Sequence, residues 1–557
     1  MATIRATTAP LLTHEVLNQP PPLSGRNLAQ DDRPLLEGVE REGAGWVLDR
    51  LREDGAFWGG EPQQWGVLAN ERTPVLRTHD RYGNRVDEVQ YDESWHRLMS
   101  AGVERELHAL PWRTDQAGAH VARAALLMLA GQAEGGFMCP ITMTCAVVPA
   151  LRAQPELAAE WEPLITATSY DPDTSKTAVE KGSAICGMAM TEKQGGSDVR
   201  ANTTVATPVN GGGPGAEYQV TGHKYFCSAP MSDLFLILAQ TDDGLSCFAL
   251  PRILPDGTPN AIRIQRLKDK LGNRSNASSE VEYHGAIARM VGEPGRGVAT
   301  IIEMVGHTRL DCLTGAATDM RDAVNQATWH TAHRAAFGRT LIDQPLMRNV
   351  LADLAIEAEA TTALALRMAR AYDRAGDDPQ EAHIKRLCTA VAKYYACKRV
   401  PQHAYEALEC FGGVGYVEES GMPRLYRDAP LNSIWEGTGN VMALDVLRAM
   451  AHTPEALGAF FAELDLAAGA DARYDTFVDD LRGDLADTDQ LEHRARRVVE
   501  KMAKALQGSL LVRHAPPAVA DAFCAARLAG DAGLNYGTLP TGADVESIIE
   551  RHTPAAI

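Results

Sequence analysis

The residues with the clearest chemical potential lie in one glycine-containing stretch, residues 187–198, which reads Gly-Met-Ala-Met-Thr-Glu-Lys-Gln-Gly-Gly-Ser-Asp. Its Gly195-Gly196-Ser197 turn presents successive backbone N–H groups, and glycine lets the main chain approach a ligand closely and adopt positive φ. Such a turn forms a concavity suited to a pyrophosphate or to an electron-rich ring edge. The same spacing is typical of a hairpin loop between two strands, so spacing alone does not separate a binding loop from a simple turn.

Size and composition narrow the class of protein. The chain has 557 residues, which is enough for three or four domains with buried cores. Its formal net charge of −19 argues against a general nucleic-acid-coating role but leaves room for a local basic patch. Ten cysteines occur without a Cys-x-x-Cys pair or histidines at zinc-ligand spacing, which predicts reduced thiols, no metal site and a cytoplasmic location. We find no signal peptide and no apolar run near 18 residues, so no membrane segment is expected.

Hydrophobic patterning predicts a mostly α protein with a central β domain. Residues 1–40 look irregular, and they are either a loose tail or an arm that packs on a neighbouring subunit. Helical patterns run from Val39 to about Trp161 and from Gly297 to about Met450, whereas short alternating runs between Cys186 and Arg289 predict a small barrel or sandwich. A further helical region follows. We place the four regions at residues 1–185 (N-terminal arm and helices), 186–295 (β domain), 296–450 (helical bundle) and 451–557 (C-terminal helices).

Four motifs occur in order along these regions. Residues 190–198 contain Met-Thr-Glu-x-x-x-Gly-Ser-Asp, and residues 225–228 read Tyr-Phe-Cys-Ser, an aromatic-x-x-Ser/Thr element. Residues 334–338 read Arg-Ala-Ala-Phe-Gly, and residues 411–415 read Phe-Gly-Gly-Val-Gly. In type and in order, the four motifs resemble the flavin-binding elements of the acyl-CoA dehydrogenase superfamily. The expected fold is therefore acyl-CoA dehydrogenase-like: N-terminal helices, a β-barrel and a four-helix bundle, with extra C-terminal helices.

The resemblance implies a homotetramer whose FAD sites are shared between subunits. Arg334 and Phe337 would reach the flavin of the adjacent subunit, and Gly412 and Gly413 would lie near the adenosine pyrophosphate of a neighbour. The full set of implied FAD-binding residues is Met190, Thr191, Gly196, Ser197, Phe226, Ser228, Arg334, Phe337, Gly412, Gly413, Thr438 and Asn440. Glu409 departs from the family, which commonly has Gln just before the Gly-Gly element. Because a carboxylate facing a pyrophosphate is unfavourable, Glu409 should turn away or pair with a cation.

The candidate catalytic residue is Glu436, within residues 433–440, Ser-Ile-Trp-Glu-Gly-Thr-Gly-Asn. Taken by itself, this acid reads more readily as a solvated loop residue beside a packed tryptophan. The resemblance implies instead a base that removes the α-proton of an acyl thioester while the β-hydrogen leaves as hydride to flavin N5. Partial burial would raise its pKa toward the value such a base needs, and its backbone N–H would polarise the thioester oxygen. Arg309 matches the arginine that orients the base or the acyl chain, although an ordinary ion-paired arginine fits the same position.

One branch of the superfamily is closer than the rest. Residues 190–198, 267–278 and 423–427 resemble the alkylation-response branch, the AidB-like proteins, as do residues 18–20 and 41–46. The resemblance runs from about residue 15 to 450 and continues more loosely to the end. It implies a homotetramer with FAD, weak isovaleryl-CoA dehydrogenase activity and binding to double-stranded DNA.

A basic helix near the C-terminus offers a way to examine the DNA hypothesis. Five residues form an apolar seam at 4-3-4-3 spacing: Leu491, Ala495, Val498, Met502 and Ala505. Flanking them, or close by, are the cations Arg494, Arg497, Lys501, Lys504, Arg496 and Arg513. Such a row could contact phosphates in a salt-dependent, sequence-independent way. The alternative is a solvated basic face that balances the acidic segment Asp475–Asp489.

Three functional hypotheses therefore stand side by side. The first is an FAD-dependent dehydrogenase of short or branched acyl-CoA. The second is a DNA-associated flavoprotein of the alkylation-damage response whose dehydrogenase site is weak or vestigial. The third is a non-redox helical scaffold that keeps only the fold.

Overall fold

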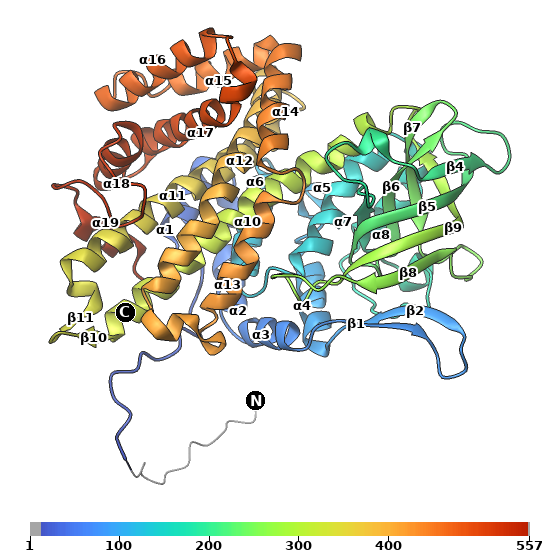
Figure 1. The fold of residues 1–557 in the computed structure, drawn as a ribbon, viewed down its shortest axis with the longest axis horizontal. Helices are drawn as coiled ribbons and strands as arrows, with labels where there is room; N and C mark the ends of the chain where they lie inside the picture. The colour runs from blue at the N-terminus through green and yellow to red at the C-terminus, as the bar shows by residue number, and fades with distance from the viewer. Residues whose placement is uncertain (1–12, 555–557) are drawn as a thin grey trace.

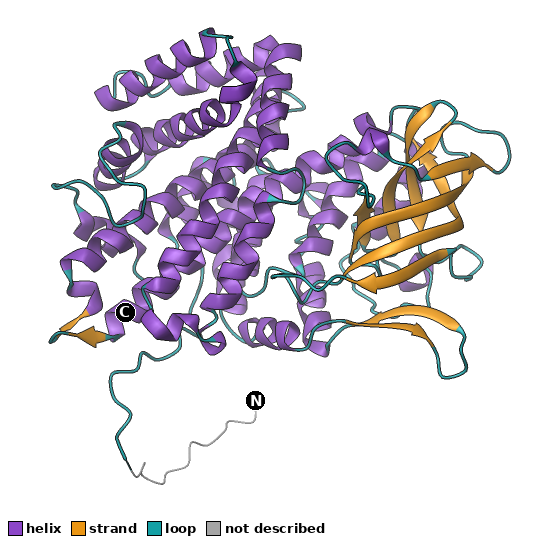
Figure 2. Cartoon of the chain, in the orientation of Figure 1, coloured by secondary structure: helices purple, strands orange, loops and turns teal. Residues whose placement is uncertain are grey.

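The computed structural model describes residues 13–554, and it places a β region beside a larger array of helices (Figures 1 and 2). Among the described residues, no helix is long and apolar enough to cross a membrane. All ten cysteines are buried, and none is paired with another.

The N-terminal helices form the first layer of the molecule. They are α1 Arg33–Arg41, α2 Leu48–Trp58, α3 Pro62–Glu71, α4 Glu93–Glu104, α5 Leu110–Arg113, α6 Ala119–Gly131, α7 Met138–Leu151, α8 Pro155–Ile165 and α9 Ala178–Lys181. Helix α6 is Ala- and Leu-rich and is buried from Ala119 to Ala130, because it lies between α2, α10 and α11. Such a helix is buried on every side rather than amphipathic, and its Arg123 is paired with Asp311.

Two expectations for this part of the chain were wrong. Helix α1 begins at Arg33, inside the segment 1–40 that was expected to be irregular, and Asp32 caps it by accepting from the Leu35 N–H. An antiparallel hairpin, β1 Val75–His79 and β2 Arg85–Gln90, interrupts the region expected to be wholly helical. Most hairpin side chains are exposed, so the strands lack the apolar alternation that marks a half-buried strand.

The β region closes on itself, as a barrel would. Its strands are β3 Cys186–Ala189, β4 Val205–Pro208, β5 Glu217–Ser228, β6 Leu234–Thr241, β7 Gly244–Pro251, β8 Ile262–Leu267 and β9 Ser278–Val291. The pairing order β6-β4-β5-β9-β7 returns to β6 through an antiparallel β6–β7 ladder, while β3 pairs in addition with β6 and β8 pairs in addition with β9. Because both faces of β6 and β7 are covered, their sequences are continuously apolar rather than alternating.

Long helices form the bundle on which the site is built. They are α10 Gly297–His333, α11 Pro345–Arg374 and α12 Pro379–Glu409, followed by α13 Met422–Asp428 and α14 Gly439–His452. A short hairpin, β10 Ala335–Ala336 and β11 Arg339–Thr340, connects α10 to α11. The N-terminal arm folds back onto this part of its own chain: Asn18 exchanges two hydrogen bonds with Ala335, and the Trp329 indole donates to the Pro21 carbonyl at 2.7 Å.

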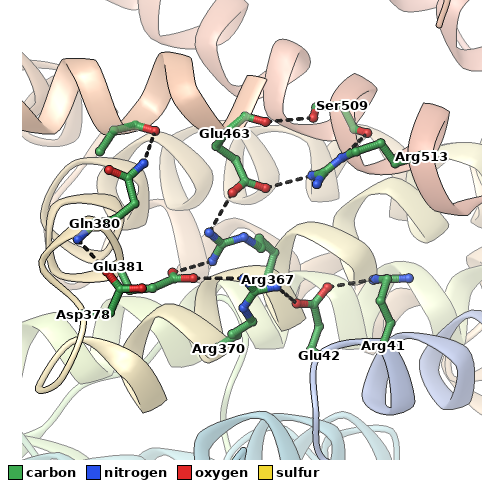
Figure 3. A network of polar contacts seen from close by, with 11 residues as sticks. Arg41, Glu42, Arg367, Arg370, Asp378, Gln380, Glu381, Glu463, Ser509 and Arg513 are labelled. Carbon is green, nitrogen blue, oxygen red and sulfur yellow. Dashed lines mark hydrogen bonds and ion pairs between the residues drawn. The ribbon is translucent and has the colours of Figure 1, made fainter. Parts of the chain in front are cut away.

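The C-terminal helices pack against the far side of α11 and α12 (Figure 1). They are α15 Pro454–Asp465, α16 Ala472–Ala486, α17 Leu491–His514, α18 Pro517–Phe523 and α19 Val545–His552. Figure 3 shows the polar network at this junction, in which Arg367 of α11 donates to Glu381 of α12 and to Glu463 of α15, each at 2.8 Å. Glu463 also accepts from Arg513 of α17 at 2.8 Å. Charged side chains with little solvent exposure therefore connect four helices from two regions of the sequence.

Candidate active site

One cavity of about 630 Å³ lies between the β region, α7, α10 and the loop before α14. It gathers nine of the residues singled out from the sequence: Met190, Thr191, Gly196, Ser197, Phe226, Ser228, Arg309, Glu436 and Thr438. These residues come from segments up to 248 positions apart in the chain, Met190 to Thr438 (438 − 190). The fold thus brings the glycine turn and the candidate base to the walls of one cavity.

The glycine turn is held in shape by a buried ion pair that the sequence did not reveal. Glu192 and Lys224 are both fully buried, and the Lys224 Nζ lies 2.8 Å from Glu192 Oε1. The Glu192 carboxylate also accepts from the N–H groups of Thr203 and Thr204, at 2.7 and 3.1 Å. Burial alone would raise the pKa of Glu192, but the Lys224 ammonium and these donors hold it well below its usual range. The buried Glu192–Lys224 pair therefore holds the loop in place.

Gly196 has no room for a side chain. A Cβ atom there would lie 2.5 Å from the Thr191 hydroxyl oxygen. Thr191 is itself fixed through its carbonyl, which accepts from the Tyr225 N–H at 2.8 Å. Next to this turn, the hydroxyl groups of Ser228 and Ser278 are 3.0 Å apart, and the Phe226 ring is half exposed. A ligand that lies flat on this wall meets backbone, hydroxyl groups and one aromatic ring.

Glu436 faces the same cavity from a left-handed turn. Its φ is +58°, and its carbonyl accepts from Arg309 Nε at 3.0 Å. Arg309 also donates to Asp445 of α14 at 2.8 Å, so the arginine is ion-paired as well as bound to the Glu436 backbone. The Oε2 atom of Glu436 is buried and has no hydrogen-bond partner among the described residues. Burial raises the pKa of Glu436, against the opposing effects of the Thr308 hydroxyl, Lys393 and Arg309.

A half-buried lysine, Lys270, also lines the cavity. Burial lowers the pKa of Lys270 to about 8, and its Nζ donates to the Asn276 carbonyl at 2.6 Å and to Ser278 at 3.2 Å. The string around Lys270 was visible in the sequence, but the sequence does not show which of its lysines turns inward. The Glu192–Lys224 pair was also missed, because it joins a loop and a strand that meet only in the folded chain.

Five of the implied cofactor residues do not line this cavity: Arg334, Phe337, Gly412, Gly413 and Asn440. The Phe337 side chain is 99% exposed at the tip of the β10–β11 hairpin. A Cβ added at Gly412 or Gly413 would meet no atom within 4 Å. Asn440 is exposed in the first turn of α14, two residues after Thr438.

Glu409 is exposed at the end of α12. Its carboxylate lies close enough to the Tyr405 hydroxyl to raise the pKa of that tyrosine. In the described part of the chain no cation pairs with Glu409. One of the two expectations for this carboxylate, pairing with a cation, is therefore not met.

The basic helix α17 forms as predicted, with Ala495, Val498, Met502 and Ala505 buried. Most of its cations are engaged within the chain. Arg494 pairs with Asp487, Lys501 with Asp484, Lys504 with Glu500 and Arg513 with Glu463. Arg496 and Arg497 are exposed, and Arg496 donates to the Tyr394 hydroxyl at 3.1 Å. The helix therefore presents fewer unengaged charges than the spacing predicted.

Comparison with known proteins agrees with this architecture. Residues 18–172 match the model "Adaptive response protein AidB N-terminal domain", residues 187–286 match "Acyl-CoA dehydrogenase, middle domain", and residues 295–451 match "Acyl-CoA dehydrogenase, C-terminal domain". The chain is 45% identical over 518 residues to "Putative acyl-CoA dehydrogenase AidB" of Escherichia coli (strain K12), covering 92% of this chain and 94% of that protein. It is 32% identical over 480 residues to "Acyl-CoA dehydrogenase family member 11" of Caenorhabditis elegans, covering 82% of this chain and 73% of that protein.

Solved structures show the same fold. The Caenorhabditis elegans ACDH-11 structure in complex with C11-CoA matches with a TM-score of 0.85 and 26% identity, covering 100% of this chain and 95% of that one. The Bd2924 apo-form matches with a TM-score of 0.82 and 28% identity, covering 89% of this chain and 99% of that one. The closed β region between helical regions is thus the fold class of the acyl-CoA dehydrogenases. By its identity over nearly the whole length, the chain belongs to the AidB branch of the acyl-CoA dehydrogenase family.

Proposed function

We propose that the protein is an FAD-dependent oxidoreductase of the acyl-CoA dehydrogenase type, acting on short or branched acyl-CoA with Glu436 as the catalytic base. One observation carries this proposal. A buried carboxylate oxygen of Glu436, without a partner in the described chain, lines the same cavity as the glycine turn at Gly196. A desolvated acid whose pKa is raised is suited to accept a proton at neutral pH.

The residues around the cavity fit a flavin. Because Gly196 has no side chain, the backbone there is open to a ligand. Ser197, Ser228 and Thr191 place hydroxyl groups beside it. One solved relative of the same fold, the acyl-CoA dehydrogenase of Bacillus anthracis, is complexed with FAD, with a TM-score of 0.62 and 16% identity, covering 83% of this chain and 80% of that one. FAD bound here supplies the acceptor for a hydride.

The chain itself would perform the proton chemistry. The ionised Glu436 carboxylate takes the α-proton of the acyl thioester, and the C–H electron pair becomes part of the new α,β double bond as the β-hydrogen leaves as hydride. The thioester oxygen gains enolate character and is stabilised by the backbone N–H of Glu436. Arg309 fixes the position of that residue through its carbonyl. The aromatic and methionine side chains on the cavity wall exclude water from the reacting atoms.

An anaerobic visible spectrum tests this proposal. Purified protein saturated with FAD is recorded before and after addition of isovaleryl-CoA, and the flavin band should bleach. In Glu436→Gln the band should persist, because the amide binds the same space without accepting a proton. Bleaching at the wild-type rate in Glu436→Gln would exclude this residue as the base. A bound flavin that no short or branched acyl-CoA bleaches would contradict the proposed substrate class.

A second role, binding to double-stranded DNA, is favoured by the exposed Arg496 and Arg497 on α17. Phosphate contacts from these cations would make the affinity fall steeply with salt. Retardation of duplex DNA should weaken in Arg496→Ala/Arg497→Ala and stay unchanged in Arg448→Ala, an exposed arginine on α14. Retardation that persists in the double variant would exclude α17 as the contact surface.

A further inference from the structure

The loop that carries Glu436 adopts a conformation that its residue types do not favour. Glu436 has φ of +58° and the following Gly437 has φ of +110°. The left-handed region is unfavourable for a side chain with a Cβ, and such a residue keeps this conformation only where its surroundings hold it. The structure must therefore supply contacts that keep the turn in place.

Those contacts come from one lysine on α12. Lys393 Nζ donates to the carbonyls of Trp435 and Gly437, each at 2.9 Å, and to the carbonyl of Asn432 at 3.1 Å. A lysine ammonium has three donors, so all three are used on this one loop. Its side chain is almost fully buried, and no carboxylate of residues 13–554 lies within ion-pairing distance of it.

Lys393 and Arg309 bind different carbonyl groups of this loop. Arg309 of α10 holds the carbonyl of Glu436, and Lys393 of α12 holds the carbonyls of the residues on either side. Three consecutive carbonyls are thus fixed from two helices, which orients both the backbone N–H and the side chain of Glu436. Lys393 is not among the residues that line the cavity, so it acts on the loop and not on a ligand.

We propose that Lys393 is a positioning residue that holds the left-handed turn of the catalytic loop and thereby aims Glu436 into the cavity. The chemical consequence rests on the function proposed above, whereas the effect on the loop does not. Its positive charge also opposes the rise that burial causes in the pKa of Glu436. Loss of Lys393 should therefore alter the position of the base and its titration together.

The test measures proton removal apart from hydride transfer. FAD-loaded protein is incubated anaerobically with isovaleryl-CoA in D₂O, and deuterium at the α-carbon is followed across a range of pH. In Lys393→Met exchange should slow by about 100-fold, the cost of a displacement of roughly 1 Å, and the midpoint of its pH profile should rise because a nearby positive charge is gone. Lys176→Met, which removes a lysine of an exposed ion pair, should match the wild type.

A second readout separates this proposal from the proposed function. Amide hydrogen exchange of residues 432–438 should accelerate in Lys393→Met and not in Lys176→Met. If the loop loosens while even the wild type exchanges no α-proton, the positioning role stands and the proposed function fails. An unchanged loop, or unchanged proton exchange and pH midpoint in an active protein, overturns the proposal.

If Lys393→Met does not fold, Lys393→Arg tests the positioning role of Lys393. Arg keeps the charge, but its planar fork cannot reach three carbonyls as an ammonium does. Lys393→Arg should keep the wild-type pH midpoint and still lose about tenfold in α-proton exchange. Wild-type exchange together with a wild-type loop in this variant would show that the three-carbonyl geometry is not needed.

Discussion

Glu436 combines two unfavourable features, a left-handed backbone and a buried carboxyl group, at one residue. Burial raises its pKa above the usual value of 4.5, and only the ionised form can accept a proton. We therefore expect the rate of flavin reduction by isovaleryl-CoA to increase with pH through a midpoint above 4.5. Single-turnover rates between pH 5 and 9 check this, and a rate that is flat above pH 5 would contradict it.

The raised pKa of Glu436 has the opposite pH dependence in its effect on stability. A carboxyl whose pKa is raised binds its proton more tightly in the folded chain than in the unfolded chain. Its contribution to the free energy of unfolding is thus present below pH 4.5 and is lost as pH rises through the folded pKa. At Glu436 the rate of proton removal therefore rises with pH while the contribution to stability falls, and such opposition is common at functional sites.

Gly196 offers a prediction about the cofactor. In Gly196→Ala the new methyl group would displace the Thr191 side chain, which lies 2.5 Å from the position of the Cβ. We expect the bound FAD per chain to fall at least tenfold in a flavin titration, with little change in the circular dichroism spectrum. Gly458→Ala is the matched control, because Gly458 lies within α15 with open space around it. FAD binding equal to the wild type in Gly196→Ala would mean that the turn does not contact the cofactor.

At the scale of elements, Arg367 joins α11 to α12 and α15. Replacing it by leucine leaves the nearly buried carboxylates of Glu381 and Glu463 with fewer partners (Figure 3). Removing one partner of a buried ion pair costs about 3–5 kcal/mol. A thermal melt should therefore show a fall of several degrees in Tm, whereas Arg482→Leu, at an exposed pair with Asp465, should change it little. Equal effects of the two variants would show that the buried network is not what joins the helices.

Where α6, α10 and α11 meet, the aromatic side chains include two buried histidines. The rings of His120 and His307 are 5.2 Å apart, and burial, with Arg123 and Lys385, lowers the pKa of His120 to about 3. Because the unfolded histidine binds protons below pH 6.5 and the folded one does not, stability is lost as pH falls below 6.5. For His120 the loss between pH 7 and pH 5 is about 2 kcal/mol.

We therefore expect His120→Phe to flatten the decline of Tm between pH 7 and pH 5. The substitution removes the titrating group, and His120 Nδ1 has no hydrogen-bond partner to lose in residues 13–554. His284→Phe, at an exposed histidine, should leave the slope unchanged. If both variants decline as steeply as the wild type, the packing of α6 against α10 is not the acid-sensitive contact.

The sequence predicted elements well where burial is continuous and poorly where it is not. Helices α11 and α12 lie within the region 297–450 that was expected to be helical, and strands β5 to β7 lie within the region 186–289 that was expected to form a β domain. The β1–β2 hairpin and the short β10–β11 hairpin were missed, since few of their side chains are buried. Helix α17 was expected correctly, but the pairing of Arg494, Lys501 and Lys504 with nearby carboxylates decides which charges are available.

At the scale of the whole molecule, the first helix, α1, and the last helix, α19, meet on the bundle. Arg551 of α19 pairs with Glu37 of α1 and with Glu359 of α11, and His552 lies 2.9 Å from the same Glu359. The Arg551–Glu37 contact joins residues 514 positions apart and the His552–Glu359 contact joins residues 193 positions apart, so pattern and spacing could not predict them. They tie the C-terminal helices to the bundle, whereas the cavity is lined by residues of the β region, α7, α10 and the loop before α14.

The β10–β11 hairpin offers the sharpest prediction at this scale. Phe337 is 99% exposed and has φ of +54°, which is an unfavourable arrangement for a large apolar side chain in a single chain. A subunit neighbour that covers Phe337 would account for it, as the family resemblance implies. If subunits form a tetramer with shared flavin sites, as the resemblance implies, Phe337→Ala should shift sedimentation toward smaller species and lower the FAD content, because such a site would lose one wall. Leu534→Ala, at an exposed leucine near the C-terminus, should keep the wild-type assembly. A Phe337→Ala protein that sediments and binds FAD like the wild type would show that the hairpin does not reach a neighbouring flavin site.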